Sequence, residues 1–368
     1  MSDSLLHQIA LTLVPQVGAV TAKTLVSYCG SAEAVFQARR QELLKIPGIG
    51  PTVADCLQLP EPLQQAEREL VFLEKNHVTA LFYTHDRYPV RLRQCHDSPA
   101  MLFFKGSSVD LLNAERIIAM VGTRQPTDYG KALCEEIVEG LKPYNVLMVS
   151  GLAYGVDITA HRKATAVNMP NIGVLGQGLA SIYPAQHRST AEKMLENGGL
   201  LTEYIAATRP DRENFPMRNR IIAGLCDALV VVESAISGGS MISAEMASGN
   251  EREVFALPGR AKDPKSAGCN LLIKSMRAKL MESAADLAAA LQWPEPGKSK
   301  TVQTKLFLDL SIAETRLLEL IRQTPDIPID LLSSSANLPP GELAALLLAL
   351  EFKGAIRTLP GKRYRVMG

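Results

Sequence analysis

Two arginines and an asparagine stand together in the segment Phe-Pro-Met-Arg-Asn-Arg, residues 215–220. Arg218 and Arg220 carry planar guanidinium groups, which can donate two parallel hydrogen bonds to phosphate oxygens. Asn219 lies between them, and an apolar, strand-like run follows at 227–232. This combination indicates a phosphate ligand at one edge of a sheet. The alternative is structural, because buried arginines often pair with carboxylates of the same chain.

Short turns rich in glycine and hydroxyl residues follow four of the predicted strands. Glycine lets a ligand approach the backbone closely, and free N–H groups at a helix start bind anions. Turns in α/β proteins need glycine anyway, so one such loop is weak support, but four loops together with arginines favour a phosphate-binding surface. The third loop is Gly176-Gln177-Gly178. The candidate contacts in the other loops are Gly122, Thr123, Arg124, Ser150, Gly151, Tyr154, Gly238, Gly239 and Ser240.

Two common nucleotide-binding motifs do not fit this chain. The segment Gly297-Lys298-Ser299 has Gln292 where a phosphate-loop ATPase needs its first glycine. No G-x-G-x-x-G joins the strand expected at 117–121 to the helix after it. We therefore expect neither this type of ATP hydrolysis nor an ordinary dinucleotide site, and no cofactor.

Four titratable residues raise a chemical alternative. Asp157 and His161 lie four apart on a predicted helix, but they lack the third ligand that a metal site needs, so we expect structural roles. Glu203 and Glu233 stand at strand ends, where they either orient the arginines or act as a base. The second option describes a nucleotide-processing hydrolase with a Rossmann-like fold. Because no nucleophile or activating base stands beside either glutamate, we do not expect an enzyme. Because the third ligand is missing, we expect no metal.

The composition is that of an ordinary globular protein, with 46% hydrophobic residues, 21% charged residues and a formal net charge of +1. The six cysteines stand singly, without zinc spacing, so we expect reduced and mostly buried thiols in a cytoplasmic protein. The longest apolar region, 221–236, is interrupted by charges, and the N-terminus lacks a signal-peptide pattern. We expect no membrane span. The stretch from Arg260 to Lys279 holds six basic residues and one acidic, so a polyanionic partner stays open.

Between Arg116 and about Leu291, apolar strand-like runs alternate with helix-length segments. This alternation predicts a mainly parallel sheet with helices on both faces, in which ligands collect at the carboxyl ends of the strands. We expect a Rossmann-like α/β domain over residues 81–292. The predicted strands are 117–121, 146–149, 171–175, 200–203, 229–232 and 253–257.

Residues 1–80 are expected to form a small helical domain with helix-hairpin-helix turns. The segments 14–20 and 45–51 share an apolar-Pro-x-apolar-Gly pattern, whose glycines let backbone N–H groups approach a phosphate. Acidic neighbours such as Glu42 and Asp55 repel a DNA backbone, so a packing role is an equal alternative.

A linker is expected at 293–305 and a winged-helix domain at 306–368. The third helix of this domain carries five leucines, which suit a protein partner, whereas the basic hairpin leaves a DNA role open. An adaptor that works only through its two terminal domains is a third functional option. The helices are expected at 313–321, 329–335 and 342–352, and the hairpin at 355–366.

Taken in order, these motifs resemble the DprA/Smf family of DNA-processing proteins. The helix-hairpin-helix start and winged-helix end agree with the architecture of some members. The chain departs from the family pattern at 237–244, where it has an extra glycine, and at Gln177 in the third loop. The matching elements are Gly122-Thr123-Arg124, Ser150 to Ala153 with Gly155 and Asp157, Ala160-His161, Ile182-Tyr183-Pro184, Phe215-Pro216 with Arg218 to Arg220, Ser237 to Ser240, and Leu257 to Gly259.

The resemblance implies a protein without enzymatic activity that binds single-stranded DNA, protects incoming DNA and loads the RecA recombinase during natural transformation. It also implies a Rossmann-like core that forms a homodimer and holds DNA in a basic pocket. Arg124 matches the family's phosphate-gripping arginine, and Arg218 and Arg220 match its arginine pair. Lys163 falls near a basic position used for DNA, and Lys274 is added from the basic segment alone.

Recognition of single strands also needs surfaces on which bases stack, yet aromatic residues are only 5% of the chain. The candidates are Tyr154, Tyr183, Tyr204 and Phe215. We expect Tyr204 and Phe215 to pack in the core. Tyr154, beside a glycine in an open loop, is the better stacking surface.

Overall fold

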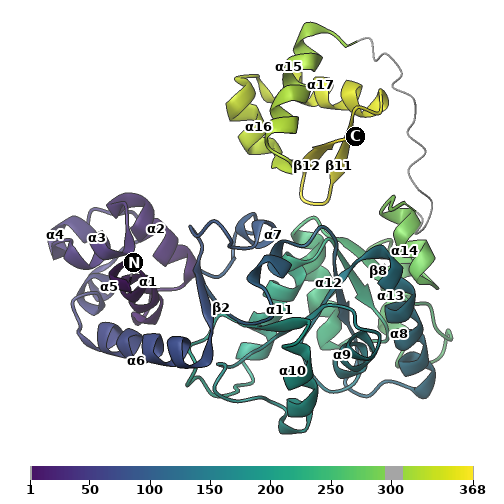
Figure 1. The fold of residues 1–368 in the computed structure, drawn as a ribbon, viewed down its shortest axis with the longest axis horizontal. Helices are drawn as coiled ribbons and strands as arrows, with labels where there is room; N and C mark the ends of the chain where they lie inside the picture. The colour runs from purple at the N-terminus through teal and green to yellow at the C-terminus, as the bar shows by residue number, and fades with distance from the viewer. Residues whose placement is uncertain (1, 295–309, 368) are drawn as a thin grey trace.

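The computed structural model describes residues 2–294 and 310–367. A helical N-terminal domain and a winged-helix domain flank a central α/β domain (Figure 1). The expected linker at 293–305 lies outside the described residues from 295 onward, as do residues 306–309 of the expected winged-helix domain.

The N-terminal domain is built from six helices joined by short turns. Gly18 and Gly50 are the N-cap residues of the second and fifth helices, and no other atoms lie within 4 Å of the position that a Cβ would take on either. The space beside these two helix starts is therefore open, as a close approach of a phosphate to a helix-hairpin-helix turn requires. The helices are α1 (Ser2–Leu13), α2 (Ala19–Cys29), α3 (Ala32–Gln37), α4 (Arg40–Leu43), α5 (Pro51–Cys56) and α6 (Glu61–Asn76).

The central sheet has nine strands in the order β1-β2-β6-β5-β4-β3-β7-β8-β9. The pairs from β6 through β9 are parallel, whereas β1 and β2 extend one edge with antiparallel pairing. The expected mainly parallel sheet is confirmed. The strands are β1 (Thr79–Phe82), β2 (Met101–Gly106), β3 (Ile117–Val121), β4 (Leu147–Ser150), β5 (Asn171–Val174), β6 (Gly198–Thr202), β7 (Ala228–Val231), β8 (Glu253–Ala256) and β9 (Lys279–Leu280).

Three strands of the central sheet were not anticipated, and β6 starts two residues earlier than expected. β1 crosses the expected domain boundary at residue 80, β1 and β2 extend one end of the sheet, and β9 forms the other end. β6 begins at Gly198 rather than at Leu200. The sequence did not indicate its first two residues because both are glycines, which are uncommon in strands. A Cβ on Gly199 would lie 2.6 Å from the ring of Phe104 on β2, so this strand pairing needs glycine there.

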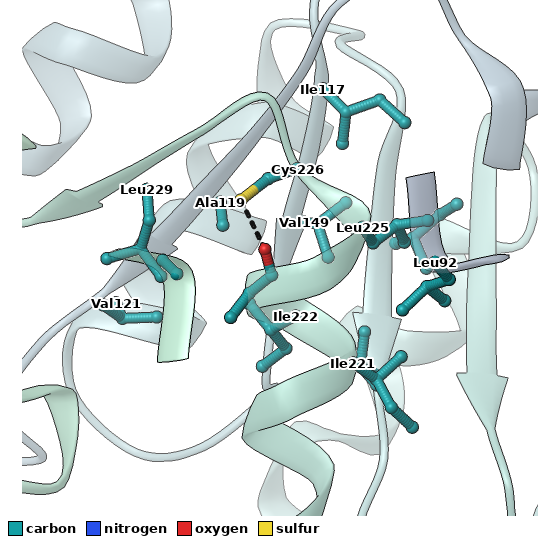
Figure 2. Packing of buried hydrophobic residues seen from close by; sticks show 14 of the residues in the cluster. Leu92, Ile117, Ala119, Val121, Val149, Ile221, Ile222, Leu225, Cys226 and Leu229 are labelled. Atoms are coloured by element: carbon teal, nitrogen blue, oxygen red, sulfur yellow. Dashed lines mark hydrogen bonds between the residues drawn. The ribbon is translucent and has the colours of Figure 1, made fainter. Parts of the chain in front are cut away.

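Helices cover both faces of the parallel part of the sheet, and the strand residues alternate between them. In β3, Ile117, Ala119 and Val121 belong to one buried cluster, while Ile118 and Met120 belong to another. The first cluster includes residues of α11, α12 and α13, and part of it is shown in Figure 2. The second includes residues of α8, α9 and α14. The bounds are α8 (Asp128–Leu141), α9 (Val156–Ala166), α11 (Asn214–Leu225), α12 (Gly239–Gly249), α13 (Ala267–Lys274) and α14 (Ala284–Ala290).

The remaining helices of this domain are short and connect strands at its edges. They are α7 (Val90–Arg93), α10 (Arg188–Met194), and the 3₁₀ turns η1 (Val109–Asn113), η2 (Lys142–Tyr144) and η3 (Ala185–His187). Of the six cysteines, four are buried and two are partly buried, and none forms a disulfide. In the part of the chain that the structure describes, no helix is long and apolar enough to cross a membrane.

The C-terminal domain has the expected three helices and a hairpin packed around leucines and isoleucines. Its hairpin, the wing, turns toward the central domain (Figure 1). Three ion pairs join the two: Arg363 with Asp227 at 3.2 Å, Arg365 with Glu115 at 3.3 Å, and Lys362 with Glu251. The bounds are α15 (Ile312–Gln323), β10 (Ile327–Pro328), α16 (Ile329–Ala336), α17 (Pro340–Phe352), β11 (Ile356–Leu359) and β12 (Arg363–Val366).

Candidate functional site

A groove of about 660 Å³ opens at the carboxyl ends of the parallel strands. The loops after β3, β4, β5 and β7 contribute to it, together with the start of α11 and the start of α12. β3 and β7 are neighbours whose following connections run in opposite directions along the sheet, and ligands of open α/β folds collect at such a point. The groove therefore occupies the position where this fold offers a binding site.

Most of the candidate contacts from the sequence line this groove. They come from separate segments between residues 122 and 240, and the parallel sheet brings these segments together at one edge. The candidates in the lining are Gly122, Thr123, Arg124, Gly151, Tyr154, Arg218, Asn219, Gly238, Gly239 and Ser240.

The loop after β3 presents Arg124 to the groove. Thr123 N donates to the backbone oxygen of Glu233 at 2.7 Å, and Val156 N donates to the backbone oxygen of Thr123 at 3.2 Å. Gly155 has φ +81°, and a Cβ there would lie 2.2 Å from Thr123 O, so only glycine lets the two loops touch. The exposed guanidinium group of Arg124 lies 5.9 Å from the ring centre of Phe215.

Arg218 forms part of the groove wall from beneath the loop after β4. Its side chain is only 3% exposed, and its Nη1 donates to Val174 O at 2.9 Å, while its Nε has no hydrogen-bond partner. A Cβ on Gly151 would lie 1.7 Å from that Nη1, so the glycine makes room for the guanidinium group. Burial lowers the pKa of Arg218, and the nearby charge of Arg124 lowers it further.

Asp157 is the carboxylate that balances this charge. Its Oδ2 accepts from Gly151 N at 3.2 Å and from Ala153 N at 3.3 Å, and its charge attracts that of Arg218. Burial raises the pKa of Asp157 despite these partners. The lining contains three arginines, Arg124, Arg212 and Arg218, against this single acidic residue, so the groove favours an anionic ligand.

The start of α12 closes another side of the groove. Gly238 is its N-cap residue and provides no side-chain cap, so N–H groups of the first turn are left for a ligand. Ser240 Oγ donates to Ser234 Oγ at 2.7 Å, which holds the turn in shape. A Cβ on Gly238 would lie 2.5 Å from Ser234 Oγ, whereas Gly239 has open space around it. The turn has the glycines and the unused N–H groups on which the sequence bases its prediction of an anion cradle.

Four candidate contacts are placed elsewhere. Ser150 is fully buried and donates to Met120 O at 2.6 Å. Lys163 lies on α9 and pairs with Glu139 of α8 at 2.6 Å. Lys274 ends α13, outside the groove lining. Arg220 turns away from the groove and pairs with Glu203 while also donating to Asp97 O. The expectation that both Arg218 and Arg220 face a phosphate ligand is thus corrected for Arg220, which has the structural pairing that was the alternative for both.

The two glutamates proposed as bases do not line the groove. Glu203 is held by Arg220, and burial raises its pKa. Glu233 accepts from Thr127 N at 2.8 Å and from Thr127 Oγ1 at 2.5 Å. A Cβ on Gly130 of α8 would lie 2.4 Å from the carboxyl carbon of Glu233, so this helix covers it. Neither glutamate therefore supplies the hydrolase alternative with a base in the groove.

His161 has the structural role that was expected. Its Nδ1 lies 2.9 Å from Asn171 Oδ1, which joins α9 to β5, and burial lowers its pKa to about 4. Within residues 2–294 and 310–367, no three histidine, cysteine or acidic side chains gather closely enough to hold a metal.

Aromatic rings stand along one side of the groove. Tyr154 and Tyr183 are 43% and 47% exposed, and both line the groove. Phe215 also lines it and contacts Tyr183, with 5.8 Å between ring centres, so the expectation that Phe215 packs in the core is corrected. Tyr204 is partly buried and does not line the groove. The groove thus combines guanidinium groups with ring faces, a pairing suited to single-stranded nucleic acid.

Arg212 and Gln177 are two of the lining residues that were not among the candidate contacts. Arg212 lies in the loop before α11, within a charged stretch that gives no periodic signal. Gln177 was noted as unusual in its loop but was not proposed as a contact. Neither residue belongs to a spacing pattern. The only signals in the sequence were that Arg212 lies close to Phe215-Pro216 and that Gln177 lies in a glycine turn.

A Rossmann-like sheet with an arginine-lined groove at its switch point, flanked by helix-hairpin-helix and winged-helix domains, defines a class of nucleic-acid-handling proteins. The comparisons with known proteins agree with that class. The chain belongs to the DNA recombination-mediator protein A family, whose model matches residues 79–292. Residues 308–362 match the DprA winged helix domain, and residues 9–58 match a helix-hairpin-helix motif.

Relatives extend this match across most of the chain. Protein Smf of Escherichia coli is 34% identical over 309 residues, which are 83% of this chain and 82% of the relative. DNA processing protein DprA of Bacillus subtilis is 36% identical over 62% of this chain and 78% of its own length.

Two solved structures share the fold. DNA processing protein A of Streptococcus pneumoniae is 31% identical, with a TM-score of 0.67 over 77% of this chain and 97% of that one. The corresponding protein of Helicobacter pylori is 27% identical, with a TM-score of 0.53 over 58% of this chain and 95% of that one. The Helicobacter structure concerns the single-stranded DNA binding mode of that protein.

Proposed function

We propose that this protein binds single-stranded DNA in the groove at the β3–β7 edge, and that it does so without an enzymatic reaction. The observation that carries the proposal is the set of three arginines around one carboxylate, with Arg218 Nε left without a partner. Buried guanidinium donors of this kind are satisfied by phosphate oxygens. The single-stranded DNA binding mode described for the Helicobacter relative supports the choice of ligand.

The proposed cellular role rests on family membership. We infer that the protein protects incoming single strands in the cytoplasm and loads RecA on them during natural transformation and recombination, acting as a homodimer through its Rossmann-like domain. Family membership supports this role, and the position of the groove in the central domain leaves both terminal domains for partners.

The test replaces Arg124 by Ala. Because Arg124 is exposed in the groove and carries a charge, its removal should weaken binding to short oligonucleotides of every sequence. The slope of log affinity against log salt should also fall, by about 0.7 for each phosphate of a single strand that the variant no longer neutralises. Fluorescence anisotropy titrations at several salt concentrations measure both quantities.

The matched control is Arg87→Ala. Arg87 is also exposed and belongs to the central domain, but it pairs with Asp110 and does not line the groove. We expect this variant to retain the affinity and the salt slope of the unchanged protein. If Arg124→Ala behaves like Arg87→Ala, the groove is not the DNA site.

A further inference from the structure

Gln177 is a polar side chain at the groove wall whose hydrogen-bonding groups are unused. The residue is fully buried, and neither Oε1 nor Nε2 has a hydrogen-bond partner. Its backbone, in contrast, is firmly held. Thr202 Oγ1 donates to Gln177 O at 2.8 Å, and the next residue, Gly178, donates its N–H to Thr208 O at 3.0 Å. The main chain is therefore satisfied while the amide is not.

An amide in this condition needs an explanation, because buried polar groups in proteins are nearly always paired and leaving them unpaired is costly. An apolar side chain of similar size would fill the same space without that cost. A ligand in the groove is the explanation that the surroundings support, since Arg218 Nε in the same wall is also buried and unpartnered. Gln177 and Arg218 thus both line this groove with buried polar atoms that have no hydrogen-bond partner.

The neighbours of Gln177 are aromatic. A Cβ on Gly176 would lie 3.0 Å from the ring of Phe215, so this ring packs directly over the residue before Gln177. Phe215 in turn contacts Tyr183, whose ring is 47% exposed. Flat apolar faces beside an amide form the setting in which a nucleobase stacks and offers its edge.

We propose that Gln177 binds the Watson–Crick edge of a nucleobase, through Nε2 as donor and Oε1 as acceptor. This inference rests on the proposed function, because it adds a base contact to the phosphate contacts of the same groove. Every base carries a hydrogen-bond donor next to an acceptor on that edge, and an amide turned by 180° matches either order. The contact is therefore tolerant of sequence.

The same contact distinguishes single strands from duplexes. In a duplex the Watson–Crick edge is occupied by the opposite base, so it cannot bond to Gln177. Arg124 and Arg218 contact only phosphates in this scheme, and a duplex offers phosphates as well. Gln177 thus supplies selectivity for unpaired bases, whereas the arginines supply affinity.

Access to the amide involves side chains rather than the fold. Because Gln177 is shielded from water, the lining must shift to admit a base edge. Tyr183 and Phe215 are both partly exposed and contact one another, so rotation of either ring changes this wall without moving the sheet.

The experiment compares two single strands of equal length with the full chain. One carries ordinary bases, and the other carries abasic tetrahydrofuran sites on the same phosphodiester backbone. Gln177→Leu should lower affinity for the base-bearing strand about tenfold, the loss expected for one amide–base pair. Its affinity for the abasic strand should equal that of the unchanged protein. Its preference for a single strand over the matching duplex should fall by the same factor.

Controls separate this contact from general damage to the site. Arg124→Ala should lower affinity for both strands, because phosphates are common to them. Thermal unfolding should show Gln177→Leu to be at least as stable as the unchanged protein, since it removes an unpaired buried amide. Gln177→Met, which is unbranched like glutamine, repeats the test if the leucine does not fit.

Two results overturn the inference while leaving the proposed function intact. One is an equal loss of affinity for the base-bearing and abasic strands in the folded variants. The other is unchanged affinity for the base-bearing strand. If the unchanged protein binds neither strand, the proposed function fails first and this inference fails with it.

Discussion

Single residues decide which of the two neighbouring arginines reaches the groove. Arg218 and Arg220 lie two apart on α11, and residues two apart on a helix point about 200° from one another. Arg218 therefore faces the loop after β4, while Arg220 faces Glu203 on the other side. Gly151 then determines how close Arg218 comes, because a side chain there would occupy the place of its guanidinium group.

This packing predicts the effect of Gly151→Ala. The added methyl group would overlap Arg218 Nη1, so the arginine must move and its hydrogen bond to Val174 O should break. We expect a decrease in the free energy of unfolding of about 1–3 kcal/mol, typical of overpacking. Weaker binding to single strands should accompany it. Urea unfolding and anisotropy titrations measure the two effects.

Gly249→Ala is the matched control for that substitution. Gly249 ends α12 and has no other atoms within 4 Å of the place that a Cβ would take. The free energy of unfolding of the Gly249→Ala variant should stay within about 1 kcal/mol of that of the unchanged protein, because alanine is a better helix former than glycine. Equal stability of the two variants would show that Gly151 is not needed for close packing.

Among the structural elements, α9 orients the central loop of the groove. Its first turn begins beneath the groove, where Asp157 holds the loop after β4 through two backbone N–H groups. One turn later, His161 joins the helix to Asn171 at the start of β5. Asp157 and His161, which resemble an acid–base pair in sequence, are therefore one helix turn apart and connect α9 to the loop after β4 and to β5 by hydrogen bonds.

The buried histidine predicts how stability depends on pH. Burial lowers the pKa of His161 to about 4, below the ordinary value of 6.5, so the unfolded chain takes up a proton between these values and the native protein does not. Stability should therefore fall as the pH drops from 6.5 toward 4. The decrease from this group is on the order of 3 kcal/mol.

The comparison with His161→Gln isolates that effect. Glutamine can still bond to Asn171 but does not titrate in this range. Asp157, whose pKa burial raises, titrates in both proteins and cancels in the difference. We expect urea unfolding between pH 4.5 and 7 to give a steeper decline for the unchanged protein. Parallel curves would contradict the assigned role of His161.

For the molecule as a whole, charge arranges the winged helix against the central domain. In all three of the ion pairs named above, the wing supplies the basic partner and the central domain supplies the acidic one. Arg363 is 3% exposed, and burial together with the charge of Arg91 lowers its pKa to about 10. The basic hairpin that left a DNA role open in the sequence is thus occupied by carboxylates of the same chain.

Reversing the charge at two of these acidic positions should move the winged helix away from the central domain. In the double variant Glu115→Lys and Glu251→Lys, attraction to Arg365 and Lys362 becomes repulsion. We expect a longer distance between fluorescent labels on the two domains, and we expect added salt to lengthen the distance in the unchanged protein. Energy transfer between the labels measures both.

Glu245→Lys provides the control for a change of charge alone. Glu245 pairs with Arg277 inside the central domain, away from the wing. The label distance in this variant should match that of the unchanged protein. A double variant that also keeps this distance would mean that the ion pairs of Glu115 and Glu251 do not place the winged helix.

Much of this protein could be predicted from its residues alone. Alternating apolar runs indicated the parallel sheet, glycine turns at strand ends indicated the loops of the groove, and Pro-Gly patterns indicated the helix-hairpin-helix turns. These features are local, since backbone conformation and hydrophobic periodicity are carried by residues close together in the chain. β1 and β9 were missed because short edge strands carry little periodicity, and β2 lies before the alternating segment that predicted the sheet. β6 was shortened because it begins with two glycines.

Only the tertiary structure decided which polar groups face the ligand. Lys163 and Arg220 were candidate contacts together with Arg218, yet carboxylates from other elements pair with both. Of the three, only Arg218 lines the groove. Gln177 became meaningful only when its amide proved to be buried without a partner. Pairing depends on residues far apart in the chain, and the direction of a side chain depends on its neighbours. The sequence therefore indicated the sheet edge at which we propose that a ligand binds, and the packing determined which atoms there are left without partners.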